Sequence, residues 1–194
     1  VIDVIAKNEK IARSLHLPLQ AGSSTILKAM NRGYTKEQYI ALANKIKERI
    51  PGVALTADVI VGFPGETEED FQDTLDVVRQ IQFENSFMFM YSIRKGTKAA
   101  TMENQIDEAV KKDRLQRLID VQTACSLAES KTYVGKTFRV LVEGESKKNK
   151  EVLSGRTSTN KIVLFKGDKA LEGTFVNVKI NDCKTWTLYG EIVE

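Results

Sequence analysis

Three stretches of alternating apolar and polar residues, each followed by a helical pattern, fill the first two thirds of the chain. The predicted strands are 15–20, 54–62 and 86–92. Apolar residues at helical spacing predict helices over 24–31, 36–49, 68–82 and 106–133. Because strand starts recur about every 35 residues, the pattern predicts a parallel β/α array. Three units cannot close a barrel alone, so we expect the missing strands upstream, in a longer protein.

Local signals predict where two of these helices begin. Thr35 with Gln38, and Thr67 with Asp70, have the spacing of a capping box, in which each residue bonds the other's backbone N–H group. The last helix keeps its apolar period except at Gln122, which interrupts it.

From Tyr133 onward every element is predicted to be a short strand. Apolar residues alternate with polar ones after Lys136, and further strands are predicted near 151–158, 161–165, 173–182 and 185–193. Five strands in about 60 residues predict a small barrel of the OB type. The domains are therefore predicted as 1–132, an α/β part, and 133–194, an all-β part. The aromatic residues of the second part follow strand alternation, so we expect most of them in its core.

Composition narrows the class of protein. The chain has 194 residues, of which 42% are hydrophobic, enough for a real core. No run approaches the roughly 18 apolar residues of a membrane span, and no signal peptide is visible, so we expect a cytoplasmic protein without membrane attachment. Cys125 and Cys183 have neither metal-site nor disulfide-framework spacing. Residues 134–194 hold 11 of the 29 basic but 8 of the 26 acidic residues, so the whole net charge of +3 lies there.

Polar residues on two neighbouring predicted strands indicate a pocket. His16 and Gln20 share one face of the first strand, and Asp58 belongs to the polar face of the second. Such folds place their sites at the carboxyl ends of the strands. Two alternatives remain: Asp58 as a buried carboxylate satisfied by a neighbouring loop, and His16 as a structural residue.

The turn "GFPGETEED" joins the second strand to its helix. It lacks the Lys-Ser/Thr pair of a phosphate loop, and its four carboxylates would repel phosphate. A neutral or cationic ligand suits it better, such as an adenine with an amine or sulfonium, the combination found in S-adenosylmethionine. A plain capped turn would look similar.

Longer stretches resemble a known family. "DVIVGFPGETEEDF" resembles the fifth-strand adenine motif of radical-SAM enzymes, and "LHLPLQAGSSTILKAMNRGYTKEQY" resembles the tRNA and ribosomal-protein methylthiotransferases. "LSGRTSTNKIVLF" resembles the TRAM domain that ends those proteins. The resemblance covers nearly the whole chain and implies the C-terminal half of a partial radical-SAM (β/α) barrel, followed by a TRAM barrel.

The resemblance implies an activity and cofactors. The family adds a methylthio group, here to isopentenyl-adenosine beside the tRNA anticodon, using S-adenosylmethionine and two 4Fe-4S clusters. It implies cofactor contacts at Gln20, Ser23, Asp58, Gly62 and Glu66. The Cys-x3-Cys-x2-Cys motif of the family is absent, so we expect no metal ligand in this chain, cluster ligands outside it, and no activity of the chain alone.

The basic residues of the second domain are candidate contacts to the tRNA anticodon arm. Arg156, Lys161 and Lys166 flank a predicted hairpin and are expected to cluster on one face. Lys147 and Lys148 stand in an adjacent loop, where the alternative is a merely solvated charge run. Phe89, Tyr91 and the "RKGT" segment 94–97 are candidates for the substrate side of the pocket. The alternative for the two aromatics is a core position, which is the more frequent role of an aromatic stripe on a strand.

Other functions stay open. Sister methylthiotransferases act on threonylcarbamoyl-adenosine tRNA or on a ribosomal protein, and a non-catalytic RNA-binding translation factor is an alternative of another class. The sequence indicates neither the tRNA species nor the sulfur source nor the catalytic residues. A monomer is expected.

Overall fold

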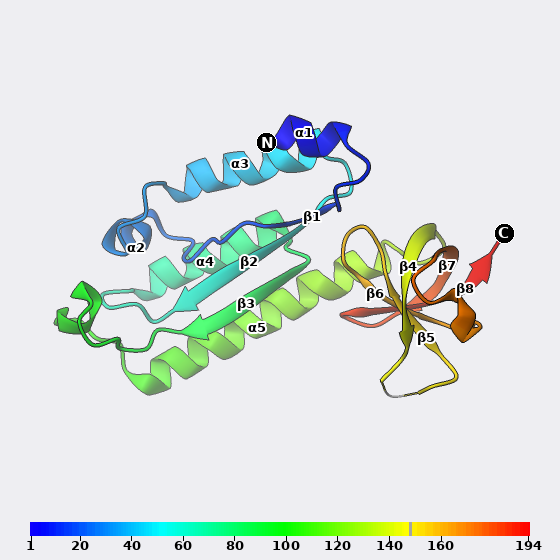
Figure 1. The fold of residues 1–194 in the computed structure, drawn as a ribbon. Coiled ribbons are helices and arrows are strands. Elements are labelled where there is room, and N and C mark those ends of the chain that lie inside the picture. Colours follow the sequence, from blue (N-terminus) through cyan, green and yellow to red (C-terminus); the bar gives the residue numbers. More distant parts are fainter. Residues whose placement is uncertain (148) are drawn as a thin grey trace. The chain divides into compact units, whose positions relative to one another are not determined.

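The computed structural model describes residues 1–147 and 149–194. The chain forms two compact units. We call residues 15–51 and 55–125 the β/α unit, and residues 1–14, 52–54 and 126–194 the barrel unit. Segments far apart in the chain thus share a unit: the N–H group of Arg13 donates to the Ser158 carbonyl, 2.7 Å away. Figure 1 shows the elements of both.

A three-stranded parallel sheet is the centre of the β/α unit. Its order is β1 (Ser14–His16), β2 (Ala54–Val61), β3 (Asn85–Met90), as predicted. β2 and β3 pair in parallel from Thr56↔Asn85 to Val61↔Met90. β1 is shorter than predicted because its ladder with β2 slips by one residue: the Leu17 N–H donates to the Thr56 carbonyl, and the next bond comes from Gln20, three residues on, to Asp58, two residues on. Pairing nonetheless resumes at Gln20, whose N–H donates to the Asp58 carbonyl over 2.8 Å.

Helices and short turns complete the elements: α1 (Ile2–Lys7), α2 (Ser24–Ala29), α3 (Lys36–Arg49), α4 (Glu68–Ile81), α5 (Glu108–Lys131), η1 (Lys98–Thr101) and η2 (Lys169–Leu171). Both predicted capping boxes are present, at Thr35 before α3 and at Thr67 before α4. None of the described helices is both long and apolar enough to cross a membrane.

The buried face of α5 is mostly polar. Arg114, Leu118, Gln122, Ser126 and Ser130 follow one another at four-residue spacing, and each is at most 5% exposed. Gln122, the residue that interrupts the apolar period, is the centre of this face. Its side-chain NH₂ donates to the Phe83 carbonyl and its oxygen accepts from Ser86 Oγ, both over 2.9 Å. Gln122 therefore ties α5 to the segment that leads into β3.

Five strands close the barrel in the order β4-β5-β6-β8-β7, which confirms the predicted five-stranded barrel. They are β4 (Thr137–Glu145), β5 (Leu153–Arg156), β6 (Ile162–Phe165), β7 (Phe175–Cys183) and β8 (Thr187–Val193). Only β6 and β8 pair in parallel; all other pairs are antiparallel. The alternating apolar residues fill the interior, including Val140, Val142, Leu153, Val163, Phe165, Val178, Ile180 and Leu188.

Candidate functional site

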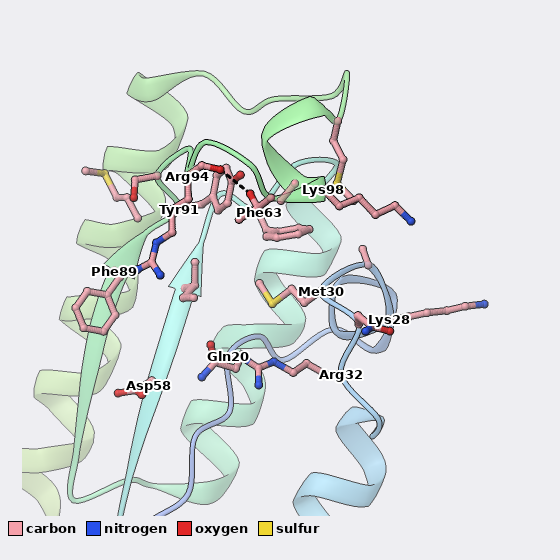
Figure 2. Close-up of a pocket in the computed structure, with 18 residues that line it drawn as sticks. Gln20, Lys28, Met30, Arg32, Asp58, Phe63, Phe89, Tyr91, Arg94 and Lys98 are labelled. Atoms are coloured by element: carbon pink, nitrogen blue, oxygen red, sulfur yellow. Dashed lines mark hydrogen bonds between the residues drawn. The ribbon is translucent and has the colours of Figure 1, made fainter.

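A cavity of about 930 Å³ opens at the carboxyl ends of β2 and β3, where sites are expected in such sheets (Figure 2). Its polar wall comes from Gln20 and Asp58. Its apolar wall includes Met30, Ile60, Phe63, Phe89 and Met102. The structure thus brings two of the five predicted cofactor residues together in one cavity.

Gln20 is held by the sheet itself. Its φ of 69° lies in the left-handed region, its N–H donates to the Asp58 carbonyl, and its carbonyl accepts from the Ile60 N–H, both over 2.8 Å. A sparsely populated backbone conformation persists only when its surroundings hold it in place. At Gln20 two backbone hydrogen bonds do so. Only 8% of the residue is exposed. The backbone of Gln20 is thus fixed, and the residue lines the cavity.

Asp58 has a partner on the neighbouring strand. Its Oδ2 lies 3.4 Å from Nε2 of His16, whose Nδ1 is 2.9 Å from Thr56 Oγ1. The carboxylate side chain is 33% exposed. The alternative of a fully buried Asp58 satisfied by a loop is therefore wrong: Asp58 meets the cavity with one side and an imidazole with the other.

Ser23 does not line the cavity. It is 2% exposed and caps α2, accepting the Ile26 N–H, while its own hydroxyl donates to Asp70 Oδ1 over 2.5 Å. Burial alone would raise the pKa of Asp70, but hydrogen bonds from Ser23 and Thr67 outweigh it and lower that pKa. The observed contacts of Ser23 join the starts of α2 and α4.

Gly62 and Glu66 face α5 instead of the cavity. The Gly62 N–H donates to Glu66 Oε2, which also pairs with Arg114 Nη1, both at 2.8 Å. A Cβ added at Gly62 would lie 2.2 Å from Cγ of Lys111. Burial raises the pKa of Glu66, and the Gly62 N–H and the Arg114 guanidinium limit the rise. A larger residue at Gly62 would therefore clash with α5, whereas a cofactor contact was expected at this position from the sequence.

The acidic turn is neutralised from within the β/α unit. Glu68 pairs with Arg117 at 2.5 Å, and hydrogen bonds from Arg117 lower the pKa of Glu68. Arg114 and Arg117 both lie near the Phe71 ring, with Arg117 at 4.7 Å from its centroid. Sequence reasoning missed this pairing. Two arginines three residues apart on one helix could have indicated a partner for the acidic turn.

Aromatic residues line the side of the cavity opposite Gln20. Phe89 is 51% exposed, and Tyr91 packs edge-on against Phe63 with ring centroids 5.3 Å apart. The Tyr91 hydroxyl is buried and has no hydrogen-bond partner among the described residues. Both residues, with Arg94 and Thr97 of the "RKGT" segment, line the cavity. Residues 28–32, from the end of α2 into the loop before α3, also line it and were missed by sequence reasoning.

The predicted RNA-contacting cations of the barrel unit do not cluster. Arg156 is about one-third exposed and pairs with Glu143, whereas Lys161 is 4% exposed with its ammonium 5.8 Å from the Tyr133 ring centroid. Lys147 and Lys166 are exposed. Because Leu153 pairs with Phe165 and Arg156 with Ile162, Lys166 and Lys161 lie at opposite ends of the hairpin. Lys148 lies outside the described residues. The expected common face is thus wrong for Lys161 and Lys166.

Two barrel aromatics are at the surface, against the expectation of a core position. Phe175 and Trp186 are each 55% exposed. Phe175 pairs across strands with Leu141, which in turn pairs with Arg156, so the three side chains share the outer face. The Arg139 guanidinium lies 3.9 Å from the Phe175 centroid. This face therefore combines an aromatic ring with two arginines.

Comparisons with known proteins agree with this architecture. Residues 1–78 match the model of the radical SAM superfamily and residues 131–193 match that of the TRAM domain. A protein of Fusobacterium nucleatum named tRNA-2-methylthio-N(6)-dimethylallyladenosine synthase is 75% identical over 193 residues. Proteins of the same name from Alkaliphilus oremlandii and Moorella thermoacetica are 52% and 50% identical over 194 residues.

These relatives are longer than the chain. The match covers all of this chain but 44%, 41% and 44% of the three relatives. Among solved structures, coproporphyrinogen III oxidase from Escherichia coli, described as a radical SAM enzyme, shares the fold with a TM-score of 0.51 at 16% identity. That match covers 75% of this chain and 41% of the other. The expected half-barrel with an added small barrel is confirmed.

Proposed function

We propose that the chain belongs to the radical-SAM methylthiotransferases and that the protein carrying it attaches a methylthio group to an adenosine of tRNA. The observation that carries the proposal is the 75% identity to a named synthase along both units, together with the cavity at the carboxyl ends of β2 and β3. The proposed substrate is an adenosine that already bears a dimethylallyl (isopentenyl) group, next to the anticodon. Residues 1–132 would supply part of the catalytic barrel and residues 133–194 the RNA-binding module.

The cavity suits S-adenosylmethionine. Gln20 and Asp58 offer an amide and a carboxylate to hydroxyl, amine or sulfonium groups, and the buried Tyr91 hydroxyl still needs a partner. Phe63 and Ile60 offer apolar contact to an adenine. When bound, S-adenosylmethionine supplies the radical and the methyl group, and this chain's residues hold and orient it beside the substrate.

The cysteines of this chain do not suit a 4Fe-4S cluster. Burial raises the pKa of Cys125, which disfavours the thiolate that iron requires, and Cys183 packs against the barrel core. No three His, Cys, Asp or Glu side chains form a ligand group within the described part of the chain. We therefore assign the ligands of both clusters to other parts of the full protein, and expect the chain alone to be inactive.

The outer face of the barrel supports RNA binding. Arg139, Phe175 and Arg156 provide charge for phosphates and a flat ring for a base. Lys147 and Lys166 add exposed charge elsewhere on the barrel. The cytoplasmic location and the monomeric state remain predictions from the sequence.

Mass spectrometry of tRNA nucleosides tests the function. Deleting the full gene should remove 2-methylthio-dimethylallyladenosine and leave dimethylallyladenosine in its place. Loss of a methylthio group from threonylcarbamoyl-adenosine instead would favour the sister enzyme. An unchanged nucleoside profile would contradict the proposal, and it would turn attention to a non-catalytic RNA-binding role.

A further inference from the structure

Two of the arginines lack the side-chain contacts that the other arginines make. The chain has nine arginines. Seven have a carboxylate, carbonyl, aromatic or other interaction partner: Arg13, Arg49, Arg79, Arg114, Arg117, Arg139 and Arg156. Among the described residues, the guanidinium groups of Arg32 and Arg94 alone have no hydrogen bond, ion pair or ring contact, and both residues line the cavity. The charge of Arg32 acts on the nearby Tyr34 hydroxyl, where it partly offsets the rise in pKa that burial causes.

The two side chains enter the cavity from different walls. Arg32 comes from the loop between α2 and α3, and Arg94 from the loop after β3. Figure 2 shows both guanidinium groups pointing inward, whereas the side chains of Lys28 and Lys98 extend away from the cavity. Asp58 is the single acidic residue in the described lining. Arg32 and Arg94 therefore bring two positive charges into the cavity against the one carboxylate of Asp58, and this balance favours an anionic ligand.

We propose that Arg32 and Arg94 bind the two phosphates that flank the target nucleotide when its base enters the cavity. This inference rests on the proposed function, since it takes RNA as the substrate. A guanidinium matches a phosphate with two parallel N–H···O bonds, a geometry that a lysine cannot reproduce. Enzymes that modify a base turn it out of its stack and hold it in a pocket. Phosphate contacts then fix the register of the strand.

The two-wall arrangement favours phosphodiesters over the other available anion. The amino-acid part of S-adenosylmethionine has one carboxylate, which would satisfy one guanidinium and leave the second without a counter-charge. A nucleotide within a strand brings one phosphate on each side of its sugar. Met30, Phe63 and Phe89 give the same lining an apolar part that is suited to a base.

The test uses the full-length protein that carries this chain and a fluorescent anticodon stem-loop RNA containing dimethylallyladenosine. Arg32→Gln and Arg94→Gln should each weaken binding about tenfold or more, and each should lower the slope of log affinity against log salt by about one. Arg79→Gln is the matched control, because Arg79 is exposed on α4, pairs with Asp76 and does not line the cavity. It should bind like the wild type.

A second arm locates the contact. Replacing each phosphate beside the target nucleotide with a neutral methylphosphonate should weaken wild-type binding. The same replacement should cost little in the variant whose arginine faces that phosphate. This non-additivity identifies a direct pair, which a general loss of positive charge would not produce.

Three results would overturn the inference. Arginine variants that bind the stem-loop like the wild type would remove the phosphate role while leaving the proposed function intact. Variants that bind RNA normally but lose S-adenosylmethionine in equilibrium dialysis would assign the arginines to its carboxylate. A wild-type protein that does not bind the stem-loop at all would overturn the proposed tRNA function as well.

Discussion

Replacing Gly22 by alanine should destabilise the β/α unit strongly. Gly22 follows the Gln20 segment at the point where this loop touches α4. An added Cβ would lie 2.4 Å from Thr74 Cα and 2.8 Å from the Asp73 carbonyl oxygen. Both obstacles are backbone atoms of a helix, so no side-chain rotation can relieve the clash. The loop and α4 must move apart by about 1 Å to restore ordinary contact.

The cost has two parts. Overpacking of this kind costs about 1–3 kcal/mol. The movement also breaks the 2.9 Å bond from the Gly22 N–H to Thr74 Oγ1, and leaving a buried group unpaired costs about 1–3 kcal/mol. The expected loss is therefore about 2–6 kcal/mol. At an m-value of about 2 kcal/mol/M this lowers the urea midpoint by about 1–3 M.

The assay is urea unfolding followed by ellipticity at 222 nm, to which the helices of the β/α unit contribute most. The fluorescence of Trp186, the one tryptophan, follows the barrel unit separately. Gly33→Ala is the control, since nothing lies within 4 Å of its added Cβ; it should be neutral or stabilising by up to about 1 kcal/mol. Thr74→Val removes the hydroxyl that accepts the Gly22 N–H, so it measures the part of the stability loss that comes from this hydrogen bond. Equal midpoints for Gly22→Ala and Gly33→Ala would refute the close approach.

Three further outcomes follow from the contacts. Glu66→Gln should cost up to about 3–5 kcal/mol in urea unfolding, because it leaves the buried Arg114 with only the Glu68 carboxylate, 3.6 Å from its Nε, as a counter-charge. Adding Arg114→Met should recover part of the loss, and a double variant no better than the single one would contradict this. Asp70 has a lowered pKa in the folded state, so it contributes stability above the unfolded pKa of about 3.8 that is lost as the pH falls through the folded pKa. Asp70→Asn should therefore be less stable than the wild type at pH 7, and urea titrations should converge below about pH 4. In stem-loop titrations, Lys147→Gln should lower the slope of log affinity against log salt by about one, because Lys147 is exposed. Lys161→Gln should leave that slope unchanged, because Lys161 is buried. A lower slope for Lys161→Gln with no change for Lys147→Gln would restore Lys161 as a phosphate contact.

Local patterns predicted the elements of this fold well, because their causes are local. Each capping box joins residues three positions apart, as at Thr35 and Gln38, and the spacing alone reveals it. Alternation within one strand likewise predicted the inward residues of the barrel, such as Val140 and Val142. The cavity position followed from the rule that sites lie at the carboxyl ends of parallel strands.

Contacts across long sequence distances could not be predicted in this way. Glu66 meets Arg114, 48 residues further along the chain, and nothing near Glu66 announces it. Lys161 looked like a surface residue at the end of a hairpin, yet it is buried with its ammonium near the Tyr133 ring. Gln122 looked like an interruption of a helix face, whereas hydrogen bonds to Ser86 and Phe83 make it part of that face.

The acidic turn shows how such pairing changes the chemistry assigned to a motif. Read alone, its carboxylates argue for a cationic ligand nearby. In the structure Glu66 and Glu68 pair with the arginines of α5, and Asp70 accepts hydrogen bonds from two helix caps. Their charge is thus largely used inside the β/α unit, and a buried or paired carboxylate acts weakly on a ligand beyond its partner. The electrostatics of the cavity depend instead on the carboxylate of Asp58 and the guanidinium groups of Arg32 and Arg94, a combination that suits a sulfonium cofactor beside a polyanionic substrate.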